Sequence, residues 1–342
     1  DDIAAHSAIH LGVESARADK RAGRFDKLVN GVLRSVQRQS EQFQALGGDT
    51  LIPGWLAAQW AGTYGADAVA RFAEILIQSP PLDLTLKSPD PDLIAVLGGQ
   101  PVLGPTVRLA ERDAAVADLA GFAEGKWWVQ DVSAALPARL LKAGAGEAIL
   151  DLCAAPGGKT AQLASAGARV TALDISADRM ARVRANLDRL ELNAEIVVAD
   201  ALDYAPGPVF DAVLLDAPCS ATGTFRRHPE VLLHRNAQGI AERVALQRKM
   251  LAHATALLKP GGRLIYCVCS LEPGEGEDQL AWVQSSLPEL EPSAIATSEL
   301  DGWDTPLTPQ GAVRLTPAMA LPNGVAGALD GFFIARFIRK PV

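Results

Sequence analysis

The chain has 342 residues, of which 49% are hydrophobic and 21% are charged, and its formal net charge is −8 at pH 7. This balance predicts a folded protein with more than one domain, because single hydrophobic cores usually stop growing near about 250 to 300 residues. No apolar run approaches the roughly 18 residues that a membrane span needs. The acidic balance argues against indiscriminate binding of nucleic acid, although a local basic face remains compatible with it.

The first residues, D-D-I-A-A-H, contain neither a starting Met nor a basic flank followed by an apolar core. We therefore expect a trimmed chain that has no signal peptide and that is located in the cytoplasm. The four cysteines are too few for a disulfide scaffold in a chain of this length, so we expect free thiols.

The first predicted element is a helix from Phe25 to Val36, with one apolar face formed by Phe25, Leu28, Val29, Val32, Leu33 and Val36. We interpret it as a helix that packs on a neighbour through this stripe and leaves its charged face in solvent. A surface that faces RNA is the alternative. The breaker-rich segment A-L-G-G-D-T-L-I-P-G-W (45–55) marks a boundary, so we assign residues 1–48 to a helical amino-terminal region.

Residues 49–125 are expected to form a small α+β module that binds RNA or links the flanking regions. Helices are predicted over 55–64 and 67–77, and the alternating sequence S-P-P-L-D-L-T-L-K (79–87) predicts a strand. The large aromatic residues of the first of these helices recur near every fourth position, which favours core packing over stacking on bases. They are Trp55, Trp60 and Tyr64.

After Trp128, apolar strands alternate with helical stretches. The runs are E-A-I-L-D-L, A-R-V-T-A-L-D-I, E-I-V-V-A-D, F-D-A-V-L-L-D and G-R-L-I-Y-C-V. They predict an α/β fold over residues 126–342, with a Rossmann-like, doubly wound and mostly parallel sheet. A final run, D-G-F-F-I-A-R-F-I, follows with no intervening crossover signal and predicts an antiparallel strand near one edge.

Ligands of such sheets bind beyond the carboxyl ends of the strands. The first strand leads into D-L-C-A-A-P-G-G-K-T, where Gly157 and Gly158 permit a tight turn and close approach of a ligand to the backbone. The second and third strands end at Asp174 and Asp200, which suit a ribose diol and an adenine amino group, although either Asp also suits a helix cap. Because the loop matches neither the dinucleotide fingerprint nor a P-loop, the pattern favours S-adenosylmethionine over NAD or ATP.

The fourth and fifth strands end in D-A-P-C-S-A-T-G-T and Y-C-V-C-S, so neighbouring strand ends direct Cys219 and Cys269 toward one crevice. Cys267 lies deeper in its strand, and we interpret both it and Cys153 as packing residues. The C-x-C spacing with no nearby His pair fits zinc poorly, and we expect no bound metal.

Four segments together resemble the RNA (cytosine-5)-methyltransferases: D-L-C-A-A-P-G-G-K-T, D-A-P-C-S-A-T-G-T, Y-C-V-C-S-L-E-P-G-E-G-E and D-G-F-F-I-A. The resemblance covers about residues 120 to 342. Upstream, F-D-K-L-V-N-G-V-L-R resembles the end of a NusB-like RNA-binding domain, and W-W-V-Q-D-V-S-A resembles the entrance to the catalytic domain. The amino-terminal region is too short for a whole NusB-like domain, so we expect an incomplete affinity for RNA.

The resemblance implies a set of residues that bind S-adenosylmethionine, namely Cys153, Ala154, Ala155, Pro156, Gly157, Gly158, Lys159, Asp174, Asp200 and Asp216. It also implies that Cys269 adds to C6 of cytosine and that Cys219 helps to remove the C5 proton and release the product. The thiolate is needed because C5 of cytosine is otherwise too weak a nucleophile for a sulfonium methyl group. Asp216 is the third implied catalytic residue and would steady the N3 side of the ring as charge develops.

Three departures from the family pattern stand near these residues. Val268 occupies a position that is usually Thr, Ala221 replaces a common Gly, and E-G-E at 275–277 replaces E-N-E. None of them removes a reacting group, so they bear on rate or target choice more than on activity.

We therefore predict methylation of cytosine C5 in RNA, with 16S ribosomal RNA as the favoured substrate and transfer RNA as the alternative. A non-catalytic RNA-binding factor for ribosome assembly is the alternative of another class, and the presence of both thiols argues against it. Arg226, Arg227 and His228 fit a rim that contacts phosphate, with a solvated loop as the alternative. We expect a monomer with no membrane partner.

Overall fold

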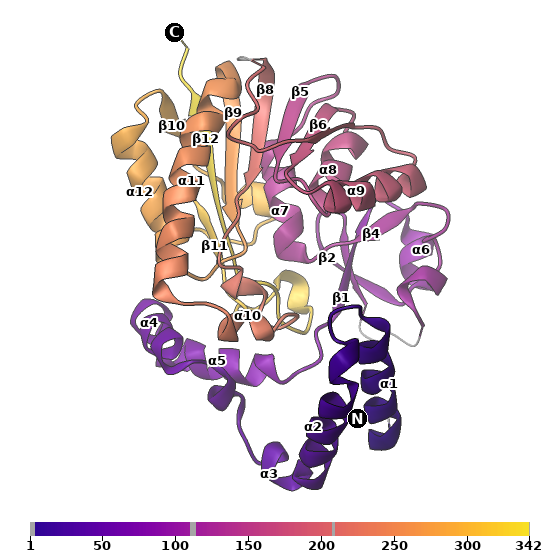
Figure 1. Cartoon of the computed structure of the whole chain (residues 1–342). Coiled ribbons are helices and arrows are strands. Elements are labelled where there is room, and N and C mark those ends of the chain that lie inside the picture. Colours follow the sequence, from indigo (N-terminus) through magenta and orange to yellow (C-terminus); the bar gives the residue numbers. More distant parts are fainter. Residues whose placement is uncertain (1–3, 110–113, 207–208, 342) are drawn as a thin grey trace. The chain divides into compact units, whose positions relative to one another are not determined.

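The structure of the chain is a computed structural model that describes residues 4–109, 114–206 and 209–341 (Figure 1). Its contacts divide the chain into two compact units, Asp1–Leu51 and Ile52–Val342. The functional ranges expected from the sequence, 1–48, 49–125 and 126–342, stay a prediction, because compactness alone assigns no role to a segment.

The first unit is helical. Its helices are α1 (Ala5–Ala18), α2 (Asp26–Arg38) and α3 (Ser40–Gln44). The predicted helix is thus present as α2, which contacts α1 and half-buries Val29 and Leu33. Leu28 and Val32 are 62% and 52% exposed, and Val36 is exposed as well. The expectation that the whole apolar stripe packs on a neighbour is therefore wrong, because α1 reaches only part of it.

The second unit begins with the helical hairpin α4 (Gly54–Tyr64) and α5 (Ala66–Leu76). Trp60 is 0% exposed, and its ring packs edge-on against Phe72 of α5 and beside Phe225. The same hydrophobic cluster includes Leu271, so the hairpin packs on segments that follow two strands of the large sheet. This burial confirms the packing interpretation for Trp60, whereas the same expectation is wrong for Trp55, which is 37% exposed.

A four-stranded antiparallel sheet follows in the order β2-β3-β1-β4. Its strands are β1 (Leu82–Leu86), β2 (Gly99–Leu103), β3 (Thr106–Leu109) and β4 (Trp127–Val129). The predicted strand at 79–87 is β1, and α6 (Pro91–Val96) begins beside it at Asp90, whose carboxylate accepts a hydrogen bond from the Leu93 backbone at 2.9 Å. Helices and antiparallel strands therefore occur together in this segment, as the sequence predicts.

The large sheet has eight strands within the described residues, in the order β10-β12-β9-β8-β5-β6-β7, with β11 paired to β12. The parallel strands are β5 (Ala148–Leu152), β6 (Arg169–Asp174), β7 (Glu195–Val198), β8 (Phe210–Asp216) and β9 (Leu258–Val268). The antiparallel strands are β10 (Leu290–Pro292), β11 (Val313–Leu315) and β12 (Phe332–Arg339). The predicted doubly wound α/β fold is confirmed, including the final antiparallel strand.

Helices cover both faces of this sheet (Figure 1). One face carries α7 (Val132–Leu141), α8 (Gly158–Ser165) and α9 (Ala177–Leu190), whereas the other carries α11 (Ala237–Leu257) and α12 (Glu277–Ser286). Alternate residues of each strand supply the two cores, as Ile149 and Leu150 of β5 do. The chain leaves β5 toward β6 and later returns to its other side as β8, so the strand order reverses beside β5.

Candidate active site

A cavity of about 550 Å³ lies at the carboxyl ends of β5 and β8, where the strand order reverses and where ligands of such sheets bind. Most of the residues expected at the site line it. They are Cys153, Ala154, Ala155, Pro156, Gly157, Gly158, Lys159, Asp216, Cys219 and Cys269. The structure thus gathers the glycine loop, one strand-end carboxylate and two thiols around one space.

The loop after β5 turns sharply at two points. Cys153 has φ 62° and Gly157 has φ 100°, both in the left-handed region. A Cβ atom on Gly157 would meet Val183 Cγ1 at 3.0 Å, so this position favours glycine for space as well as for conformation. The following helix, α8, starts at Gly158 and directs its first backbone N–H groups toward the loop.

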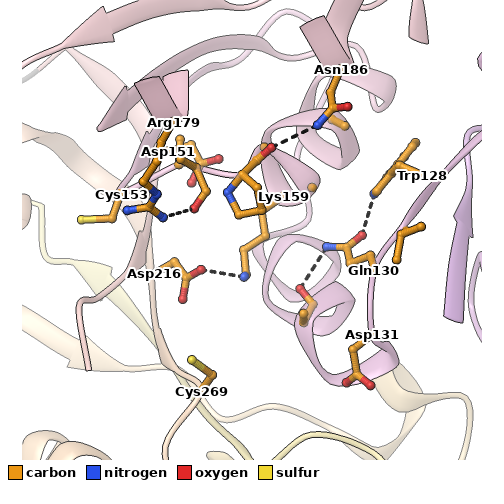
Figure 2. A pocket seen from close by; sticks show the side chains of 18 of the residues that line it. Trp128, Gln130, Asp131, Asp151, Cys153, Lys159, Arg179, Asn186, Asp216 and Cys269 are labelled. Atoms are coloured by element: carbon orange, nitrogen blue, oxygen red, sulfur yellow. Dashed lines mark hydrogen bonds and ion pairs between the residues drawn. The ribbon is translucent and has the colours of Figure 1, made fainter. Parts of the chain in front are cut away.

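Lys159 and Asp216 form an ion pair within the cavity. Lys159 Nζ donates to Asp216 Oδ2 at 2.7 Å, and Figure 2 shows the amine pointing toward this carboxylate, with the sulfur of Cys153 pointing away from it. Burial is the largest single effect and lowers the pKa of Lys159, but the charge and hydrogen bond of Asp216, together with Cys267 and Asp151, outweigh it, so the pKa lies above its ordinary value. The other Asp216 oxygen accepts a contact from Cys267 Sγ at 3.6 Å. Asp216 is therefore fixed from both sides.

The sulfur atoms of Cys219 and Cys269 lie 3.5 Å apart. They come from the ends of β8 and β9, which are neighbours in the sheet. The pKa of Cys219 lies well above its ordinary value. The main cause is the hydrogen bond with Cys269, and the next largest cause is burial. Cys267 is fully buried within β9, which confirms that it packs, whereas Cys269 follows the end of the strand and reaches the cavity.

Sequence reasoning missed Asp151, which also lines the cavity. Its side chain is 0% exposed, and Oδ2 accepts a hydrogen bond from Thr160 Oγ1 at 2.6 Å, while Oδ1 has no partner among the described residues. Burial raises the pKa of Asp151 to about 7 against the opposing effects of Thr160 and Lys159. The signal in the sequence is its place as the first residue of D-L-C-A-A-P-G-G-K-T, where it also belongs to the predicted strand.

Two expected cofactor residues do not line the cavity. Asp174 is buried behind the loop, where its oxygens accept hydrogen bonds from the backbone of Ala155 at 3.3 Å and of Ser176 at 3.0 Å. Asp200 is exposed and accepts a hydrogen bond from the Leu202 backbone at 2.9 Å. Asp174 therefore links the end of β6 to the loop after β5, whereas Asp200 acts locally in a turn, and the contact of either with a cofactor stays a prediction.

The three basic residues after β8 have different environments. Arg226 is buried and binds Asp131 as well as Asp330, with 2.8 Å between its Nε and Asp330 Oδ1, so its expected place on a phosphate-contacting rim is wrong. Arg227 lines the cavity with its side chain 38% exposed, and its Nε donates to Asp330 at 3.0 Å. His228 is exposed beside Glu230.

Within the described residues, no group of three or more His, Cys, Asp or Glu side chains is placed to hold a metal ion. No helix in the described part of the chain is both long enough and apolar enough to cross a membrane.

A parallel α/β sheet with a glycine loop and a carboxylate at its switch point defines a Rossmann-like enzyme that binds a nucleotide-type cofactor. Residues 138–338 match the family described as 16S rRNA methyltransferase RsmB/F. Proteins named ribosomal RNA small subunit methyltransferase B from Shewanella oneidensis and Salmonella paratyphi B are 36% and 37% identical to this chain. Each alignment covers 98% of this chain and 78% of the relative.

The solved structure of a methyltransferase homolog protein from Pyrococcus horikoshii is 27% identical, with a TM-score of 0.66, and the match covers 82% of this chain and 93% of that chain. The chain therefore belongs to the 16S rRNA methyltransferase RsmB/F family. It is an RNA methyltransferase with S-adenosylmethionine as its cofactor, and the resemblance seen in the sequence is confirmed.

Proposed function

We propose that this protein methylates C5 of a cytosine in 16S ribosomal RNA, as a monomer in the cytoplasm and without a metal ion. The observation that carries the chemistry is the pair of thiols, Cys219 and Cys269, 3.5 Å apart in the cavity that also holds the glycine loop. The family description, which names 16S rRNA, and the names of the relatives, which specify the small ribosomal subunit, support 16S ribosomal RNA as the substrate.

The residues around the cavity fit S-adenosylmethionine. The loop Cys153–Lys159 would hold it, because Gly157 leaves backbone surface open to a ligand and the unpartnered oxygen of Asp151 suits a cationic amino group. Asp174 and Asp200 are proposed as ligands of the ribose and the adenine. Once bound, the cofactor supplies an electrophilic methyl group.

In this proposal Cys269 is the nucleophile that adds to C6 of the target cytosine. Its sulfur forms a bond to C6 while electron density moves to C5, which becomes the nucleophilic carbon. Asp216 steadies the N3 side of the ring, and Lys159 holds the Asp216 carboxylate in place through its 2.7 Å ion pair. The target base must leave any stack to reach these groups.

Cys219 is proposed to assist the second half of the reaction. Once C5 has gained the methyl group, with the sulfur of the cofactor as the leaving group, the C5–H bond would break, the C5–C6 double bond would form again and Cys269 would leave as a thiolate. Its place in the cavity, 3.5 Å from the Cys269 sulfur, supports this role, while its raised pKa means that Cys219 must lose its own proton before it can accept the one from C5. The two thiols therefore have separate tasks in one cavity.

The test is transfer of a labelled methyl group from S-adenosylmethionine to unmodified 16S ribosomal RNA, followed by digestion to nucleosides. We expect labelled 5-methylcytidine from the wild type and at least about a thousandfold less from Cys269→Ala. Cys219→Ala should accumulate a covalent RNA complex that survives denaturation. The buried thiol of Cys267 provides the control, and Cys267→Ser, which keeps a hydrogen-bond donor beside Asp216, should retain at least about a tenth of the activity.

Other outcomes would redirect the proposal. Methyl transfer to transfer RNA in place of 16S ribosomal RNA would change the substrate and leave the chemistry intact. Full activity of Cys269→Ala would rule out its role as the nucleophile. Cofactor binding by calorimetry without transfer to either RNA would favour an assembly factor.

A further inference from the structure

Each active-site thiol is followed in the chain by a buried serine. Ser220 follows Cys219 and Ser270 follows Cys269, and both serine side chains are 0% exposed. Their hydroxyl oxygens lie 3.0 Å apart. Both hydroxyls donate to the same carboxylate oxygen, Glu275 Oε2, at 2.5 Å and 2.6 Å. One buried side chain therefore connects the residues next to both sulfur atoms.

Glu275 accepts further hydrogen bonds at this point. The Ser220 backbone N–H donates to its two oxygens at 2.9 Å and 3.1 Å, and Gln247 Nε2 donates to Oε1 at 3.0 Å. The side chain of Glu275 is 0% exposed, and its backbone carbonyl accepts a hydrogen bond from Tyr266 at 2.6 Å. Hydrogen bonds to a carboxylate are stronger than those between neutral groups, and more so in a buried site. We therefore expect Glu275 to hold Ser220 and Ser270 in place.

The hydrogen-bond network around Glu275 also includes residues before Cys219 and after Cys269. Gln247, from α11, also donates to the Pro218 carbonyl at 3.0 Å, which fixes the residue before Cys219. The Leu271 backbone N–H donates to Thr222 Oγ1 at 3.1 Å, which joins the segment after β9 to the segment after β8. Neither loop can shift by itself without breaking bonds to the other.

We propose that Glu275 is a positioning residue that sets the separation of Cys219 and Cys269 by fastening the residue that follows each thiol to one carboxylate. Glu275 Oε1 and Oε2 bond to Ser220, Ser270 and Gln247, and none of these bonds involves a sulfur atom. The catalytic meaning of this inference rests on the proposed function, because the two thiols then act in turn on C6 and C5 of one ring. A displacement of about 1 Å in such a site can cost about a hundredfold in rate.

The experiment measures thiol separation without using catalysis. Diamide oxidises two thiols to a disulfide and takes up the two electrons and two protons, and its rate in the folded full-length chain reports how readily the sulfur atoms meet. The variants are Glu275→Gln, which replaces one acceptor oxygen by a donor, and the double variant Ser220→Ala with Ser270→Ala. Peptide mapping identifies the Cys219–Cys269 disulfide and separates it from any that includes Cys267.

We expect disulfide formation to slow at least about tenfold in both variants, relative to the wild type. Glu299→Gln is the matched control, because this carboxylate is also largely buried and binds Arg336 at 2.6 Å and Lys142 at 2.7 Å, with no hydrogen bond to Ser220 or Ser270. Glu299→Gln should form the disulfide at the wild-type rate, even if its thermal midpoint falls as much as that of Glu275→Gln. If Glu275→Gln does not fold, the serine variant decides the question.

Steady-state kinetics add a second readout. In the same variants kcat should fall about tenfold to a hundredfold, while the KM for RNA and the Kd for S-adenosylmethionine stay within about twofold. A wild-type disulfide rate in folded variants would overturn the positioning role, whatever their activity. If disulfide formation slows in the variants but the wild type itself transfers no methyl group, the positioning role is supported and the proposed function is wrong.

Discussion

The Asp151 carboxyl group is fully buried, with one oxygen bonded to Thr160 and the other without a partner among the described residues. Burial raises its pKa from 3.8 to about 7, so folding favours the protonated form. This contribution to stability is complete below about pH 4 and is lost as the pH rises through about 7.

We predict that Asp151→Asn removes this pH dependence. The free energy of unfolding of the wild type, relative to the variant, should fall by up to about 4 kcal/mol between pH 4 and pH 8. Urea denaturation across this range measures it, with Asp200→Asn as a comparison at an exposed carboxylate. Parallel profiles for the wild type and Asp151→Asn would contradict the assigned environment of Asp151.

Arg227 is the basic residue after β8 that faces the cavity, and Asp330 holds it by a 3.0 Å hydrogen bond. We predict that Arg227→Ala raises the KM for RNA about tenfold and reduces the salt slope of RNA affinity by about 1, with little change in kcat. Titration of RNA at several salt concentrations tests this. Arg71→Ala, at an exposed arginine paired with Glu74, should leave both quantities unchanged, and an equal effect there would remove the specific role of Arg227.

At the scale of elements, the α4–α5 hairpin supports the segment that follows Cys269. Trp60 Nε1 donates to Glu272 Oε1 at 3.0 Å, and the Tyr64 hydroxyl donates to the Leu271 carbonyl at 2.5 Å. Burial raises the pKa of Glu272, and the bond from Trp60 opposes this effect. The hairpin is therefore fixed to the active-site loop by polar bonds as well as by apolar packing.

We predict that Trp60→Phe destabilises the protein by about 1 to 3 kcal/mol, because it keeps the ring in the core but leaves Glu272 with one donor fewer. Urea denaturation measures the change in the free energy of unfolding. Trp55 lies on the same helix and is 37% exposed, so Trp55→Phe should change stability by less than about 0.5 kcal/mol. Equal effects of the two substitutions would show that the bond to Glu272 contributes nothing.

Sequence patterns predicted the strands of the large sheet better than those of the small one. Buried branched runs predicted β5, β6, β7, β8 and β9 as parallel strands, because such strands are covered on both faces. The short strands β2 and β3 were not predicted individually, since their pairing with β1 decides them more than their own sequence does. In α2 the stripe of apolar residues predicted the helix correctly but did not reveal which part of it would be covered.

At the scale of the whole molecule, contacts divide the chain after Leu51. The cavity and its lining residues all belong to the unit Ile52–Val342. We predict that residues 52–342, expressed alone, fold cooperatively and bind S-adenosylmethionine within about twofold of the full chain. Calorimetry measures the affinity, and thermal unfolding measures cooperativity.

The same truncated protein tests the RNA-binding role expected for residues 1–48. If that role holds, the KM for 16S ribosomal RNA rises while the affinity for the cofactor does not. An unchanged KM would assign RNA recognition to the second unit, whereas loss of cofactor binding would mean that the unit depends on the residues before Ile52.

Sequence alone determined the fold class, the glycine loop and the two thiols at neighbouring strand ends. These features depend on local patterns, because strand periodicity and strand ends follow from adjacent residues. Tertiary structure alone decided that Arg226 is buried against Asp131 and Asp330, and that Glu275 joins Ser220 to Ser270. The physical reason is that burial and pairing of polar groups depend on residues far apart in the chain, and only the folded sheet brings those residues together.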